Sequence, residues 1–134
     1  MIRIPKQIYD LMIEHAKKGY PNEACGLLGG VSGKASVFYP MRNLDNASIS
    51  YFMDSREQLQ VMKAMRQAGQ ELCGIFHSHV ASEAYPSEKD VRLAFYPEAS
   101  YLIVSLSDMA KPVLRSFRIA DEKVNEEKIV IDQN

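Results

Sequence analysis

The sequence has few cysteines and no long apolar run. Its 134 residues include two cysteines, Cys25 and Cys73, which cannot form the disulfide framework of a small secreted domain. No stretch approaches the ~18 apolar residues of a membrane-spanning helix, and the N-terminus lacks the apolar segment of a secretory signal. These absences favour a cytoplasmic protein with reduced cysteines, each more typical of a small core residue than of a bridge.

The net charge of the chain is also small. The formal charge is −1 at pH 7, so no basic field is present to attract nucleic acid or an anionic membrane, and we expect neither as a partner. The hydrophobic share of 46% is ordinary for a globular protein, and the length suits one domain over residues 1–134. The oligomeric state is left open, with a homodimer as one arrangement.

Apolar periodicity predicts both helices and strands. The predicted helices span residues 6–18, about 55–69 and 87–96, and Leu59, Met62 and Met65 are expected to line the buried face of the second. The predicted strands span residues 2–5, 24–31, 35–40, 51–53, 72–79, 101–106, 113–119 and 129–131. This order predicts a single layered α/β domain with a mixed β-sheet flanked by helices.

The pair His77 and His79 is the first candidate for a metal site. Residues i and i+2 of a strand point to the same face, so both imidazoles are expected to converge on one point. Two neutral imidazoles on a strand form a good half of a zinc site. Taken alone, the pair fits equally well with two polar residues at the end of a strand.

Asp90 is the candidate third ligand. The segment after His79 is long enough to fold back, and a helix beginning near Ser87 would carry Asp90 inward on its first turn. Three protein ligands and a water are the pattern of a catalytic zinc. The alternative is that Asp90 completes a capping box by accepting the Ser87 backbone N–H.

Glu23 is the candidate base. It opens the stretch of apolar and small residues at 24–30, where a buried carboxylate is costly unless a charged group compensates it. A metal ion with its bound water would do so. Sequence physics alone favours the alternative, a glutamate that faces solvent at the start of a strand.

The three candidates fall within one longer pattern. It reads Glu-x-Cys-Gly-x-x-x-Gly, then Gly-x-x-His-Ser-His, then Pro-Ser-x-x-Asp, and it resembles the JAMM (MPN-plus) metalloproteases, especially their compact stand-alone prokaryotic members. The resemblance spans about residues 4–120. The matching positions are Glu23, Cys25, Gly26, Gly30, Gly74, His77, Ser78, His79, Ala84, Pro86, Ser87 and Asp90. Val80 departs from the pattern, because the family usually has proline there, but neither a ligand nor the base is lost.

The resemblance implies the JAMM/MPN fold, which is similar to the cytidine-deaminase fold. It also implies that His77, His79 and Asp90 bind Zn²⁺ and that Glu23 is the general acid/base. Ser87 is implied to stabilise the oxyanion, although its hydroxyl suits a helix N-cap equally well.

The implied reaction is hydrolysis of a peptide or isopeptide bond at the C-terminal tail of a ubiquitin-like protein. The short prokaryotic relatives suggest a sulfur carrier ending in Gly-Gly as the substrate. The rival from another class is a non-catalytic scaffold of the same fold, which would typically lack the ligands. A zinc deaminase would need His-x-Glu and Pro-Cys-x-x-Cys, and neither occurs.

Overall fold

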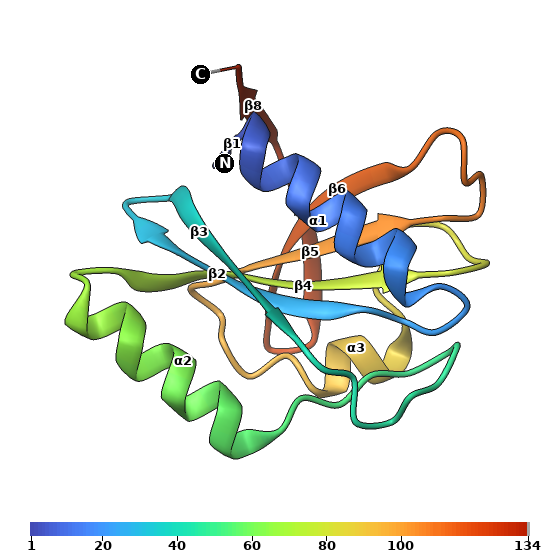
Figure 1. Cartoon of the computed structure of the whole chain (residues 1–134), viewed down its shortest axis with the longest axis horizontal. Helices are drawn as coiled ribbons and strands as arrows, with labels where there is room; N and C mark the ends of the chain where they lie inside the picture. The colour runs from blue at the N-terminus through green and yellow to red at the C-terminus, as the bar shows by residue number, and fades with distance from the viewer. Residues whose placement is uncertain (134) are drawn as a thin grey trace.

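A mixed β-sheet of eight strands runs through the centre of the protein, which is described over residues 1–133 by a computed structural model (Figure 1). The strand order is β7-β6-β5-β4-β2-β3-β1-β8. The strands are β1 (Ile2–Pro5), β2 (Cys25–Val31), β3 (Lys34–Met41), β4 (Glu71–His79), β5 (Ser100–Ser105), β6 (Val113–Ala120), β7 (Lys123–Glu127) and β8 (Ile129–Asp132). The helices are α1 (Lys6–Gly19), α2 (Ser55–Gln67) and α3 (Glu88–Arg92). The α/β architecture predicted from the sequence is confirmed.

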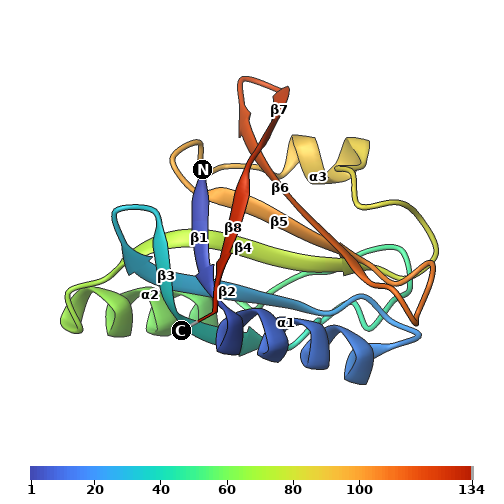
Figure 2. The same cartoon turned by 90° about the horizontal axis from the view of Figure 1, so that it is seen from above.

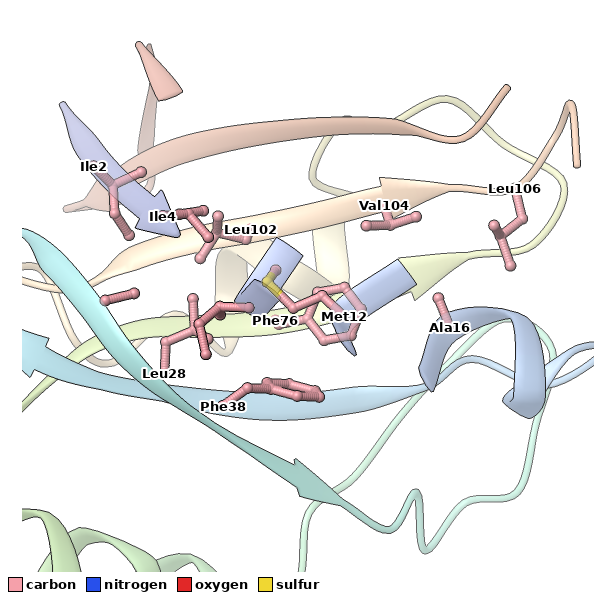
Figure 3. Packing of buried hydrophobic residues seen from close by; sticks show 12 residues of the cluster. Ile2, Ile4, Met12, Ala16, Leu28, Phe38, Phe76, Leu102, Val104 and Leu106 are labelled. Carbon is pink, nitrogen blue, oxygen red and sulfur yellow. The ribbon is translucent and has the colours of Figure 1, made fainter. Parts of the chain in front are cut away.

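Helix α1 covers one face of the sheet, and α2 and α3 lie on the other (Figure 1). Figure 3 shows the core on the first face, where Met12 and Ala16 of α1 pack with Leu28, Phe76 and Leu102 of the sheet. Strands β1 and β8 run side by side in parallel, as Figure 2 shows from above. No helix within residues 1–133 has the length and apolar character needed to cross a membrane.

The β2–β3 hairpin requires a close approach of two backbones. At Gly30, where the register shifts, an added Cβ would lie 2.0 Å from the Lys34 carbonyl oxygen. Glycine is therefore needed at this position, which belongs to the motif read from the sequence.

Two predictions about strands need correction. Residues 51–53 form no strand, because the hydrogen bonds at Phe52 go to the loop residues Asn43 and Leu44. Strand β7 was missed because its sequence is largely polar, as suits an outer strand. Its turn is formed by Asp121 and Glu122, both with positive φ, which pairs β7 with β6.

The buried face of α2 also differs from the prediction. Met65 is buried, and Met62 is half-buried as expected, but Leu59 is 67% exposed. The inward face follows the helical spacing of Gln58, Val61, Met62 and Met65. Leu59 lies about 100° around the helix from Gln58 and so points to solvent.

Candidate metal centre

His77 and His79 lie at the C-terminal end of β4, in the middle of the sheet. Along β4 they stand two and four residues after Ile75. The side chain of Ile75 belongs to the core under α2 and α3. Strand alternation therefore turns both imidazoles to that face, as predicted. Both rings are buried, and their Nε2 atoms lie 3.1 Å apart.

Asp90 brings its carboxylate to the same point from the first turn of α3. Its Oδ2 lies 3.1 Å from His77 Nε2 and 3.2 Å from His79 Nε2. Ligand atoms placed about 2.0–2.1 Å from a tetrahedral ion lie about 3.3 Å apart, so these separations suit one small cation. The structure thus brings together the three predicted ligands in a group able to hold a metal.

A capping box fixes Asp90 at the start of α3. The Ser87 N–H donates to Asp90 Oδ2 at 2.9 Å, and the Asp90 N–H donates to Ser87 Oγ at 3.1 Å. The oxygen that accepts the cap is the one that faces both histidines. Asp90 therefore caps α3 and faces both histidines with the same oxygen, so its role as a cap leaves its predicted role as a ligand open.

The carboxylate sets the charge balance of the cluster. Burial alone would raise the pKa of Asp90, but its hydrogen bonds with His77 and His79 lower that pKa well below its ordinary range. Burial lowers the pKa of His77, which favours the neutral imidazole that binds metals. For His79 burial acts in the same direction, but the hydrogen bonds with Asp90 and with the Glu83 carbonyl raise its pKa. The Asp90 carboxylate favours a proton on the neighbouring histidines, and a dication bound by the three side chains would replace that proton.

Glu23 precedes β2 and is buried, with 6% of its surface exposed, so the solvent-facing alternative is wrong. Burial raises the pKa of its carboxyl to about 7, the charge of Asp90 adds to this effect, and His79 and Lys89 oppose it. A carboxyl with a pKa near neutrality is suited to proton transfer at physiological pH.

Ser78 fixes the backbone next to Glu23. Its buried Oγ accepts a hydrogen bond from the Ala24 N–H at 2.8 Å, and its own N–H donates to the Ala24 carbonyl at 2.9 Å. Ser78 thus ties the start of β2 to the strand that carries both histidines. The sequence pattern contained Ser78, but residue spacing gave it no role.

The two cysteines and the third histidine, His15, lie outside the cluster. Cys25 and Cys73 are free thiols, and burial raises the pKa of Cys25 to about 12 and that of Cys73 to about 11, so both stay protonated. His15, on α1, is half-buried. Its Nε2 lies 2.9 Å from the Cys25 carbonyl, and its ring meets Phe38 edge-on.

An apolar cavity of about 260 Å³ opens beside Asp90. It lies between the irregular segment at 49–53, α3 and the residues that follow α3. Four of its lining side chains are exposed apolar residues, namely Ile49, Phe52, Leu93 and Phe95. A cavity of this kind, lined largely by apolar residues and bordered by the charged Lys89 and Asp90, is typical of ligand sites.

Comparison with known proteins gives several matches of high coverage. The profile of the prokaryotic homologs of the JAB domain matches residues 5–120. The chain is 42% identical over 133 residues to the CysO-cysteine peptidase of Mycobacterium tuberculosis, covering 97% of this chain and 91% of that one. It is 33% identical over 103 residues to the desampylase of Haloferax volcanii, covering 72% and 74%.

Solved structures agree with these matches. A protein from Desulfitobacterium hafniense, 46% identical, superposes with a TM-score of 0.91 over 100% of this chain and 94% of that one. A JAB1/MPN domain protein from Archaeoglobus fulgidus, 18% identical, gives a TM-score of 0.67 over 97% and 98% of the two chains. The fold is thus the JAB1/MPN fold, as the sequence resemblance implied.

Proposed function

Because this chain belongs to the prokaryotic JAB family and is a peptidase of the JAMM type, we propose that it hydrolyses conjugates of a ubiquitin-like protein with the help of zinc. The bond is a peptide or isopeptide bond at the C-terminal tail of that protein. The observation that carries the proposal is the convergence of two imidazoles and one carboxylate within 3.2 Å of one another.

We assign the metal as Zn²⁺, held by His77, His79 and Asp90. Two histidines and one carboxylate form a set of three protein ligands that leaves a fourth position open, as in other catalytic zinc sites. Zinc in such a site supplies a water whose pKa is lowered toward ~7, and it polarises the carbonyl group that is attacked.

Glu23 is the proposed proton carrier. Its carboxylate accepts a proton from the attacking water and passes it to the amine nitrogen as the bond to that nitrogen breaks. The raised pKa supports this role, because a group with a pKa near the working pH can both accept and release a proton. Its buried position keeps bulk water from competing for that proton.

Ser87 is the proposed donor to the oxygen that becomes negative during the reaction. Its Oγ accepts the Asp90 N–H, and an oxygen that accepts one hydrogen bond keeps its own hydrogen free to donate. The side chain is exposed, so a substrate can reach it. Helix capping and transition-state stabilisation are therefore compatible in this residue.

The proposed substrate is a sulfur carrier or related ubiquitin-like protein with a C-terminal Gly-Gly. The names of the Mycobacterium and Haloferax relatives support conjugates of this class, and the assignment to this chain is by analogy. Strand β4 is paired on both sides, by β2 and β5, so the tail cannot join it as an extra strand. We place the tail along the apolar cavity beside Asp90, with glycines at the crowded approach to the metal.

The sequence alone left open a non-catalytic scaffold of the same fold. Retention of the whole ligand set together with a buried Glu23 favours the enzyme, since a scaffold has no need of them. A cytoplasmic location stays a prediction from the sequence.

The direct test is incubation of the zinc-loaded protein with folded carrier proteins extended beyond Gly-Gly by one residue, followed by intact-mass measurement. We expect a product that ends at the second glycine, and no product from the His77→Ala, His79→Ala double variant. A carrier with valine in place of that glycine should resist cleavage. Cleavage of the valine carrier at an equal rate would instead indicate a general peptidase.

A further inference from the structure

The two histidines of the proposed metal centre are held in different ways. His79 Nδ1 lies 2.8 Å from the Glu83 carbonyl, so it donates there and leaves Nε2 free as a ligand. His77 Nδ1 is buried, and no hydrogen-bond partner for it lies within residues 1–133. A metal-binding histidine is ordinarily oriented by a hydrogen bond from its other ring nitrogen. Another contact must therefore fix the plane of His77.

Tyr51 provides that contact. Its ring lies against the His77 imidazole with a centroid separation of 4.6 Å and an angle of 23° between the planes. Stacking at this distance is a favoured arrangement of two aromatic rings. The side-chain torsion of histidine that turns the ring is broad and poorly restrained by itself, so a flat neighbour restricts it.

Asn43 fixes the backbone on both sides of Tyr51. Its Nδ2 donates to the Ser50 carbonyl at 2.9 Å, and its Oδ1 accepts the Phe52 N–H at 3.0 Å. The same Nδ2 donates to the Glu23 carbonyl at 3.0 Å. One carboxamide therefore joins the segment that carries Tyr51 to the backbone of the proposed base.

We infer that Tyr51 is a positioning residue, which holds the His77 imidazole in its ligand orientation in place of the missing hydrogen bond. Asn43 supports it by fixing the segment from which the ring projects. The inference rests on the proposed function, since it assumes that His77 binds the metal. It predicts that the ring of Tyr51, and not its hydroxyl, determines how well the site holds zinc.

The test measures Zn²⁺ affinity by competition with a chromophoric chelator, without substrate. Tyr51→Phe keeps the ring and should bind zinc like the wild type. Tyr51→Leu and Tyr51→Met remove the ring and should weaken binding roughly tenfold or more, as loss of an orienting contact around a ligand typically does. Met fills the volume flexibly and serves where Leu prevents folding. Tyr9→Leu, which removes a half-buried tyrosine beside the other core, is the matched control and should keep wild-type affinity.

The visible absorption bands of the Co²⁺-substituted protein give a second readout, because they report ligand geometry and a merely structural role would not move them. We expect them to change in Tyr51→Leu or Tyr51→Met and to stay unchanged in Tyr51→Phe and Tyr9→Leu. If both ring-lacking variants bind zinc as tightly as the wild type with unchanged bands, the inference is wrong, while loss of zinc in His77→Ala leaves the proposed function standing. If the wild type binds no zinc, the proposed function fails and the inference with it.

Discussion

Ser87 and Asp90 cap the same helix reciprocally, each backbone N–H donating to the side chain of the other at 2.9 and 3.1 Å. One consequence is that Asp90 Oδ2 is already fixed before any metal arrives. A second is that a change at Ser87 acts on both the helix and the proposed oxyanion contact. These two effects can be separated by experiment.

The pair Ser87→Ala and Ser87→Gly separates them. Alanine at an N-cap costs about 0.5–2 kcal/mol, whereas glycine costs only a few tenths, yet both lack the hydroxyl. If the hydroxyl stabilises the oxyanion, both variants lose about 10²–10³-fold in kcat at saturating substrate. If Ser87 is a cap alone, the glycine variant keeps nearly full turnover. Thermal unfolding and steady-state rates measured on the same preparations distinguish the two outcomes.

The metal assignment predicts one zinc per chain. His77→Ala, His79→Ala and Asp90→Ala should each lose it, because each removes one of three ligands that converge on one point. His15→Ala is the matched control, since His15 lies outside the cluster and should leave the zinc content unchanged. Elemental analysis after gel filtration gives the answer. Full zinc occupancy in the double variant of His77 and His79 would contradict the assignment.

Glu23→Gln should keep zinc and the fold but lose about 10²–10⁴-fold in turnover, because proton transfer alone is removed. For the wild type, kcat/KM should fall as pH decreases, since protonated Glu23 cannot act as a base. The pKa of about 7 comes from burial, and a nearby dication lowers it, so this acidic limb lies at or below about pH 7. A fully active Glu23→Gln protein would place the base elsewhere.

The metal-free protein gives an independent check on Glu23. A buried carboxyl with a raised pKa binds its proton more tightly when folded, so ionisation destabilises the fold as pH rises above the unfolded value of 4.5. Metal-free Glu23→Gln should therefore melt above the metal-free wild type at pH 8. The difference should shrink as pH falls toward 4.5. This result would also exclude misfolding as the cause of lost activity.

Glu127 should make the free energy of unfolding fall as the pH becomes acidic. Burial by itself would raise its pKa, but hydrogen bonds from Ser100, Ser116 and the N-terminal ammonium, with the charge of Arg118, lower it. Its contribution is therefore present above the unfolded pKa and is lost as pH falls through the lower folded value. Glu127→Gln should destabilise the protein by about 1–3 kcal/mol at pH 7 and by less at pH 3. Urea unfolding at both pH values measures this, and an equal loss at both would refute it.

Strand alternation and the capping box are visible in the sequence, and they predicted how three residues of the candidate site are placed. Strand alternation placed His77 and His79 on one face, and the capping box placed Asp90 on the first turn of α3. The burial of Glu23 needed the family resemblance, because a glutamate at the start of a strand is more often exposed. That Glu23, Ser87 and the three ligands act as proposed stays a prediction.

Other features depend on contacts that no local pattern records. The position of Tyr51 is set by the hydrogen bonds that Asn43 makes with Ser50 and Phe52. These contacts are not visible in the sequence, where the apolar triplet at 51–53 resembles a strand. The exposure of Leu59 follows from how α2 packs on the sheet, which helical spacing alone does not fix. Strand β7 has few apolar residues, so its pairing with β6 became visible only in the folded chain.

The exposed apolar rim of the cavity should bind the folded part of the substrate. Phe95 is 70% exposed and lines the cavity, but it does not belong to the ligand cluster. Phe95→Asp should therefore raise KM for a folded carrier about tenfold or more with little change in kcat, because the contact is the same in ground and transition states. Leu11→Asp, at an exposed position on α1 across the sheet, is the matched control and should keep the wild-type KM.

A free tail peptide extends the same argument to the substrate. It lacks the globular part whose binding energy positions the bond, so it should be cut far more slowly than the intact carrier. If that globular part binds at the rim, Phe95→Asp should narrow the difference between carrier and peptide by slowing the carrier at low concentration. Progress curves for the intact carrier and the tail peptide, each measured with the wild type and with Phe95→Asp, supply the four rates. Equal rates for peptide and carrier in the wild type would show that the tail alone is recognised, and the rim would then have no part in substrate binding.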